Sequence, residues 1–264
     1  MKLERVELET DDRVARVWLS RPGVRNAFDG RMVAELREVI EGLGRDESVR
    51  VVVVGGRGKA FCAGADLEWM KKVAAFDRED NLREARAMAD LFRAISASSK
   101  PFVARVHGAA LGGGAGLVAA CDIAVAAADT RFGFTEVRLG LIPAVIAPYV
   151  LARIGESAAR ELVLTGERFD AERAREIGLV RAVVPEADLD AAVEDRAREL
   201  LQAGPRAVAE AKSLLRAVAG RRVEDVREDT VERIATVRAS EEGQEGLRAF
   251  LEKRPPRWTG GPRR

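Results

Sequence analysis

The sequence predicts an α/β fold with a largely parallel sheet, followed by a smaller helical region. Strand-like and helix-like segments alternate over the first two thirds of the 264 residues, which is the rhythm of βαβ units. The run "VRVVVVGG" (49–56) is typical of a strand that is buried on both faces. From about residue 156 the sequence becomes rich in Ala, Glu and Arg and has a helical texture. The chain length fits one main core with an appendage better than two full domains.

The individual elements follow from hydrophobic periodicity. The segment "RVARVWLS" (13–20) alternates apolar and polar residues, which predicts a half-buried strand. Residues 31–44 place apolar side chains at helical spacing and carry Gly42 and Gly44 near the end, which predicts a helix that stops there. We then expect, in order, the buried strand 49–56, a charged helical span at 67–96, and strands at 101–108 and 122–129.

The C-terminal part contains three amphipathic segments, near 187–203, 205–219 and 223–241. We therefore predict a core of residues 1–195 that carries the active site and a helical region of residues 196–264. Such a region packs either on the core or on a neighbouring subunit.

Composition excludes several classes of partner. Lys and Arg (44) nearly balance Asp and Glu (43), so the chain lacks the excess of positive charge that would hold nucleic acid. The longest uncharged run is too short and too glycine-rich to span a membrane. The first residues lack the apolar segment of a signal peptide, so we expect a cytoplasmic protein. One histidine, His107, and two cysteines, Cys62 and Cys121, predict neither a metal site nor a disulfide framework.

Two glycine-bounded turns are the main candidates for chemistry. The segment "GKAFCAGADLEWM" (58–70) follows one predicted strand, and "GAALGGGAGLV" (108–118) follows another. Each turn can carry free backbone N–H groups at the start of a helix, where donors are unpaired and partial positive charge gathers. Two such donors that converge on one point would form an oxyanion hole. The same spacing also fits two ordinary strand-to-helix turns.

The second turn has an alternative interpretation. Gly114, Gly116 and Ala119 fit the G-x-G-x-x-A pattern of a dinucleotide site, and Asp129 or Glu136 would supply its downstream acid. This reading predicts an oxidoreductase that binds NAD(H). Glycine-rich turns between a strand and a helix are common, so the pattern alone is not specific.

Several motifs in order resemble the enoyl-CoA hydratase/isomerase (crotonase) family. The resemblance is carried chiefly by "KAFCAGADL" (59–67) together with the long segment 108–143, and it is extended by 21–28, 162–180 and 250–258. It implies a crotonase-like spiral of ββα repeats with a C-terminal helical trimerisation region. It also implies an acyl-CoA thioester substrate, no separate cofactor, and a homotrimer or a hexamer built as a dimer of trimers.

The resemblance assigns roles to single positions. The backbone N–H groups of Ala65 and Gly113 correspond to the two oxyanion donors, and Glu136 corresponds to a general acid/base. Two-glutamate hydratases carry a further acid where this sequence has Gly116. The stretch containing Ala144 to Ile146 resembles a branched-chain subset that includes 3-methylglutaconyl-CoA hydratase. In such substrates, we hypothesise, a distal carboxylate orients the water.

The CoA contacts implied by the resemblance lie in two parts of the chain. The first part comprises Arg25, Ala63, Ala65, Asp66 and Leu67. The second comprises Phe250 and Lys253, which neighbouring subunits often donate. An ordinary amphipathic helix end explains Phe250 and Lys253 equally well. We expect packing or hydrogen-bonding roles for His107 and a backbone-capping role for Asp122.

The sequence thus predicts a 2-enoyl-CoA hydratase that uses Ala65, Gly113 and Glu136. A Δ3–Δ2-enoyl-CoA isomerase with the same hole and base is the alternative, because one glutamate suffices for a 1,3 proton shuttle. A noncatalytic acyl-CoA-binding scaffold is the third hypothesis, since Gly116 is compatible with a decayed site.

Overall fold

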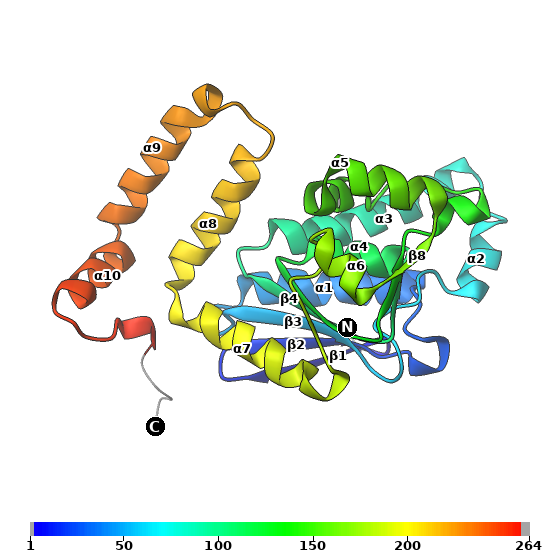
Figure 1. The fold of residues 1–264 in the computed structure, drawn as a ribbon, viewed down its shortest axis with the longest axis horizontal. Coiled ribbons are helices and arrows are strands. Elements are labelled where there is room, and N and C mark those ends of the chain that lie inside the picture. Colours follow the sequence, from blue (N-terminus) through cyan, green and yellow to red (C-terminus); the bar gives the residue numbers. More distant parts are fainter. Residues whose placement is uncertain (1–2, 260–264) are drawn as a thin grey trace.

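The fold is described by a computed structural model, in which residues 3–259 are placed (Figure 1). Its strands are β1 (Val6–Asp11), β2 (Val14–Leu19), β3 (Val51–Gly56), β4 (Phe102–Val106), β5 (Ala109–Leu111), β6 (Ile123–Ala127), β7 (Arg131–Gly133), β8 (Arg168–Asp170) and β9 (Ala182–Val184). Its helices are α1 (Gly30–Arg45), α2 (Leu67–Val73), α3 (Arg78–Ala97), α4 (Gly113–Ala120), α5 (Ala147–Thr165), α6 (Ala171–Glu176), α7 (Leu189–Gln202), α8 (Pro205–Val218), α9 (Val223–Ala239) and α10 (Glu241–Leu251).

The main sheet has the order β1-β2-β3-β4-β6-β9. Only β1 runs antiparallel to its neighbour, and the pairs from β2 to β9 are parallel. Every residue of β3 is buried, because helices cover both faces of the sheet at this central strand. The predicted α/β class, the largely parallel sheet and the strands within 13–20, 49–56, 101–108 and 122–129 are therefore confirmed.

A second, smaller sheet has the order β5-β7-β8. The chain runs from β4 of the main sheet directly into β5 of the small one, and from β6 into β7. An isolated bridge between Cys62 and Ala110 adds the segment after β3 to the same arrangement. Successive turns of the chain thus contribute one strand to each sheet, which is a spiral of repeated units.

Two apolar clusters hold these layers together. The larger lies between the sheet and helices α1, α3, α4 and α5, with buried aromatic residues such as Phe28, Phe92 and Phe134. The smaller lies on the other face, where Leu189, Val193 and Ala197 of α7 pack on the central strands. The 195/196 boundary drawn from the sequence falls inside α7, and the helices that leave the core begin with α8.

The charged span 67–96 forms two helices rather than one. Asp77 ends the linker between them, and its carboxylate accepts a hydrogen bond from the Asp80 amide at 2.8 Å, so it caps α3. Aspartate favours this non-helical capping position, which explains why the helical pattern is interrupted there.

Helices α8, α9 and α10 extend away from the core (Figure 1). Lys212 fastens α8 to the core, because its ammonium group donates to the Ile95 and Lys100 carbonyls and to the Asp122 carboxylate. These helices expose large apolar side chains, including Leu215, Ile234 and Phe250. Within residues 3–259, no helix is sufficiently long and apolar to cross a membrane.

Candidate active site

The Ala65 amide is presented by a short parallel bridge. The Phe28 amide donates to the Gly64 carbonyl at 2.7 Å, and the Asp66 amide donates to the Phe28 carbonyl at 2.9 Å. In such a bridge the residue between the two bonded neighbours turns its own N–H to the opposite side. The Ala65 N–H therefore faces away from Phe28, and Ala65 is exposed.

The Gly113 amide lies at the first position of α4. Gly112 precedes it with a φ of +51°, and its own amide donates to the Gly133 carbonyl at 2.8 Å. The Gly116 amide donates to the Gly112 carbonyl at 3.0 Å and so closes the first helical turn. The amide of Gly113 comes before that turn and has no intrahelical acceptor.

The two turns lie side by side. The Leu111 amide donates to the Cys62 carbonyl at 3.0 Å, and a Cβ placed on Gly64 would lie 3.2 Å from the Leu111 carbonyl oxygen. In residues 3–259, no hydrogen bond is donated by the amide of Ala65 or of Gly113. Each of two adjacent glycine-bounded turns thus carries one free backbone donor.

The Glu136 carboxyl group adjoins the second turn. A Cβ placed on Gly112 would lie 3.2 Å from Glu136 Oε1, and Oε2 is buried with no hydrogen-bond partner among the described residues. Burial raises the pKa of this carboxyl above its ordinary value. A half-buried carboxyl with a raised pKa and a free oxygen suits proton transfer.

Gly114 is required by the contact between the two turns. A Cβ on Gly114 would lie 2.5 Å from the Cys62 carbonyl oxygen and 2.8 Å from the Cys62 Cβ. Non-bonded contacts this short are essentially never made by a Cβ atom, so any side chain here would push the two turns apart. The Cys62 thiol is fully buried and its pKa is raised to about 12, so it has no nucleophilic role.

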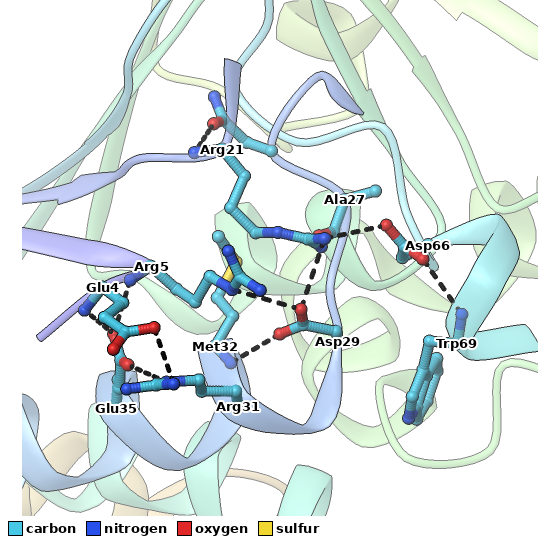
Figure 2. Close-up of polar contacts among 11 residues, drawn as sticks. Glu4, Arg5, Arg21, Ala27, Asp29, Arg31, Met32, Glu35, Asp66 and Trp69 are labelled. Atoms are coloured by element: carbon cyan, nitrogen blue, oxygen red, sulfur yellow. Dashed lines mark hydrogen bonds and ion pairs between the residues drawn. The ribbon is translucent and has the colours of Figure 1, made fainter. Parts of the chain in front are cut away.

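Asp66 and Arg21 fasten the first turn (Figure 2). The Asp66 carboxylate caps α2 by accepting from the Trp69 amide at 2.9 Å, and it pairs with Arg21 Nη2 at 3.0 Å. Arg21 also donates from Nη1 to the Ala27 carbonyl at 2.6 Å. One largely buried guanidinium therefore connects the start of α2 to the segment that includes Phe28.

The same guanidinium reaches the start of α1. Asp29 caps that helix by accepting from the Met32 amide at 2.8 Å, and its other oxygen lies 3.3 Å from Arg21 Nη2. Asn26, fully buried, accepts from the Arg21 amide and donates to the Arg57 and Ala60 carbonyls. Residues 21–29, which contain one side of the Phe28–Ala65 bridge, are thus fixed by the side chains of Arg21, Asn26 and Asp29.

The residues expected to contact CoA lie in two distant places. The Arg25 carbonyl accepts from the Ala63 amide at 3.0 Å, so the backbone of Arg25 adjoins the segment that leads to Ala65 and Leu67, and all three of these residues are exposed. Phe250 belongs to α10, which lies on the opposite side of the molecule from α2 (Figure 1), and 81% of its surface is exposed. Lys253 follows α10, so one chain does not unite the two sets.

His107 and Asp122 have the structural roles that the sequence predicted. His107 is buried between Arg105 and the Gly58 carbonyl, which lies 2.8 Å from its Nε2. The Asp122 carboxylate accepts from the Phe102 amide at 2.7 Å. Sequence reasoning missed Arg21 and Asn26, although both belong to the segment "RPGVRNAF" that it had singled out.

Comparison with known proteins identifies the family. A family model described as Enoyl-CoA hydratase/isomerase matches residues 9–261. The 2,3-dehydroadipyl-CoA hydratase of Escherichia coli is 34% identical over 249 residues, which cover 94% of this chain and 96% of that protein. The crotonyl-CoA hydratase of Syntrophomonas wolfei is 32% identical and covers 96% of this chain and 97% of its own.

A solved structure agrees with this assignment. The crystal structure of an enoyl-CoA hydratase from Shewanella pealeana has a TM-score of 0.94 and 42% identity, and the match covers 97% of each chain. A second, a crotonase-type structure from Legionella pneumophila, has a TM-score of 0.91 and 44% identity over 97% of this chain and all of that one. The predicted crotonase-like fold is thereby confirmed, and the chain belongs to the enoyl-CoA hydratase/isomerase family of enzymes.

Proposed function

We propose that this enzyme adds water to a 2-enoyl-CoA thioester, with Ala65 and Gly113 binding the thioester oxygen and Glu136 handling the proton. The single observation that carries the proposal is the juxtaposition of two unpaired amides with a carboxyl group whose Oε2 is buried and unpartnered. Membership in a family whose relatives are named as hydratases supports the same chemistry.

One carboxyl group is sufficient for both proton transfers of the hydration. The Glu136 carboxylate takes a proton from water while the water oxygen bonds to the acyl β-carbon, and the π electrons move to the thioester oxygen. The resulting enolate oxygen is stabilised by the Ala65 and Gly113 amides, each worth about 10²–10³ in rate. The protonated Glu136 then returns the proton to the α-carbon, which yields the 3-hydroxyacyl thioester.

Isomerisation of a 3-enoyl-CoA is the second candidate. Gly116 supplies no second carboxyl group, and moving a double bond from the β,γ to the α,β position requires only one base. In that reaction Glu136 removes a proton from the α-carbon, the same amides stabilise the enolate, and the proton returns at the γ-carbon.

The acyl chain that we propose is branched or carboxylated, and its distal carboxylate would orient the attacking water. Two features support this choice of acyl chain: position 116 is a glycine and supplies no acid, and residues 144–146 resemble the branched-chain subset. Equal turnover of crotonyl-CoA and of a carboxylated 2-enoyl-CoA would exclude this refinement.

CoA binding, in this proposal, is completed by a neighbouring subunit in a trimer or in a hexamer of two trimers. Arg25, Ala63 and Leu67 would contact the nucleotide from one chain, and Phe250 and Lys253 from the next. The distance between the two sets in one chain and the exposed apolar side chains of α8–α10 support this arrangement.

The test is to compare Glu136→Gln with the wild type on 2-enoyl-CoA and on 3-enoyl-CoA in deuterated water. We expect unchanged CoA affinity and turnover lower by about 10²–10⁴, because a positioned acid/base is removed. A 3-hydroxyacyl product identifies hydration, and deuterium incorporation without that product identifies isomerisation. Glu224→Gln, at an exposed position on α9, is the matched control and should change nothing.

The pH dependence provides a second readout. The active form in either reaction is the carboxylate, and burial raises the pKa of Glu136. We therefore expect kcat/KM to fall as the pH drops through an apparent pKa above the ordinary 4.5 of glutamate. Full turnover of Glu136→Gln would reject Glu136 as the base, and CoA binding with no turnover by the wild type would favour the noncatalytic scaffold.

A further inference from the structure

The side chain of Ile146 occupies the space beside Gly116. A Cβ placed on Gly116 would lie 2.2 Å from Ile146 Cγ2, 2.7 Å from its Cβ and 3.2 Å from its Cδ1. Ile146 is 3% exposed and precedes α5, so the surrounding core holds its side chain in place. No side chain can be added at position 116 unless Ile146 moves.

This contact lies next to the proposed catalytic groups. Gly116 is one helical turn after Gly112, to whose carbonyl its amide donates, and Gly112 adjoins Glu136 Oε1. Gly116 is thus connected to Gly112, the neighbour of the Glu136 carboxyl group, and it also contacts Ile146. The side chain that fills the space beside position 116 is entirely apolar.

We infer that Ile146 is a specificity-determining residue: it fills the volume that a side chain at position 116 would need, and it limits the site to the single carboxyl group of Glu136. This inference rests on the proposed function, which it deepens. The overlap between a side chain at position 116 and Ile146 is a steric claim, and protein stability tests it without any turnover.

The steric claim is tested by thermal unfolding of Gly116→Ala in two backgrounds. Alanine ordinarily stabilises a helix relative to glycine. In the wild-type background we expect the reverse, a Tm lower by about 3–10 °C, because the added methyl group overlaps Ile146. In the Ile146→Gly background, the same substitution should leave Tm unchanged or raise it.

Ile146→Gly itself lowers Tm, since it removes a buried side chain. If that variant does not fold, Ile146→Ala replaces it. Alanine removes the atoms at 2.2 and 3.2 Å but keeps the Cβ at 2.7 Å, so in that background the Tm loss from Gly116→Ala should shrink rather than vanish. Gly116→Ala with a Tm at or above that of the wild type would overturn the inference, as would an equal Tm change in both backgrounds.

The chemical claim is tested by comparing Gly116→Glu/Ile146→Gly with Gly116→Ala/Ile146→Gly. The two variants differ only in a carboxyl group at position 116. We expect the glutamate variant to form 3-hydroxyacyl-CoA from 2-enoyl-CoA at least about tenfold faster, a small part of the 10²–10⁴ that an optimised acid/base contributes. Its ratio of hydration to isomerisation should rise as well.

The possible failures are distinguishable. A wild type that transforms neither enoyl-CoA rejects the proposed function, while the Tm measurements still decide the steric claim. Equal hydration by the two double variants, with an active wild type, would mean that position 116 does not face the acyl β-carbon and would overturn the specificity role of Ile146.

Discussion

The turn that carries Ala65 and the turn that carries Gly113 are held in place by different forces. Arg21 and two helix-capping aspartates fix the first through hydrogen bonds and ion pairs. The second begins with Gly112 and has no side-chain cap; its position depends on direct contact between backbone and neighbouring atoms. Each turn carries one amide, that of Ala65 or of Gly113, with no acceptor among the described residues.

The difference predicts how each turn responds to mutation. Loss of one ion pair leaves the other bonds of the first turn in place, so its effects should be graded. Contacts below 3.0 Å in the second turn leave no room for even a methyl group, so its effects should be nearly all-or-none. The variants that follow separate these two behaviours, beginning with the largest expected effect.

Gly114→Ala should abolish most activity. Its Cβ would lie 2.5 Å from the Cys62 carbonyl oxygen, which belongs to the other turn, so the two amides must separate. We expect kcat to fall by about 10²–10³, as for the loss of one oxyanion donor. Steady-state kinetics with 2-enoyl-CoA measures this loss.

Gly42→Ala is the control for that substitution. Gly42 lies in α1, and nothing lies within 4 Å of a Cβ built there. It should keep full activity and gain stability, as is usual for a helical glycine replaced by alanine. Wild-type kcat in Gly114→Ala would contradict a sterically fixed second turn.

Arg21→Ala should have an intermediate effect. It removes the bond to the Ala27 carbonyl and leaves the Asp29 and Asp66 carboxylates without their shared partner. We expect kcat to fall by about tenfold, because a displacement of about 1 Å at a reacting group costs up to 10². Arg21→Lys should recover part of this loss.

Two readouts distinguish positioning from a general loss of structure. The Kd for CoA should rise much less than kcat falls, and the ultraviolet absorbance of a bound enoyl thioester should show weaker polarisation of its carbonyl. A variant that lowers CoA affinity and kcat together, with a normal thioester spectrum, would argue against a positioning role for Arg21.

The contrast between the turns also explains what the sequence could predict. Both turns are visible as glycines placed after strand-like runs, and the strands are visible from their periodicity, because these signals are local. The packing of Ile146 against Gly116 joins residues 30 positions apart, and only the fold brings them into contact. The Arg21–Asp66 pair is hidden for the same reason, although both residues lie within motifs that the resemblance had marked.

The start of α3 illustrates a second limit. The helical texture of 67–96 is continuous in composition, and the break before α3 is held by local side-chain bonds: Asp77 accepts from the Asp80 amide, and Asn81 donates to the Phe76 and Asp77 carbonyls. By contrast, the amphipathic patterns near 205–219 and 223–241 predicted helices with an apolar face, but such a pattern does not say what covers that face.

Asp66→Asn should have the smallest effect and is the most sensitive test of the charged turn. Asparagine caps a helix about as well as aspartate, so the bond from the Trp69 amide is kept while the charge facing Arg21 is lost. We expect kcat to change less than threefold and Tm at pH 7 to fall by about 2–4 °C, which corresponds to about 1 kcal/mol.

The sign of the pH dependence follows from the carboxyl group of Asp66. Burial raises its pKa, but the Trp69 amide and Arg21 outweigh burial and lower the pKa below the ordinary 3.8. The stabilisation is therefore complete above 3.8 and is lost as the pH falls through the lowered pKa, so the Tm difference from Asp66→Asn should shrink below about pH 3.8. Asp77→Asn is the matched control at pH 7, because Asp77 caps α3 at an exposed position where no ion pair is formed by its carboxylate within residues 3–259, and it should lower Tm less than Asp66→Asn does. A Tm difference for Asp66→Asn that is independent of pH would mean that the first turn, like the second, is held by packing rather than by charge.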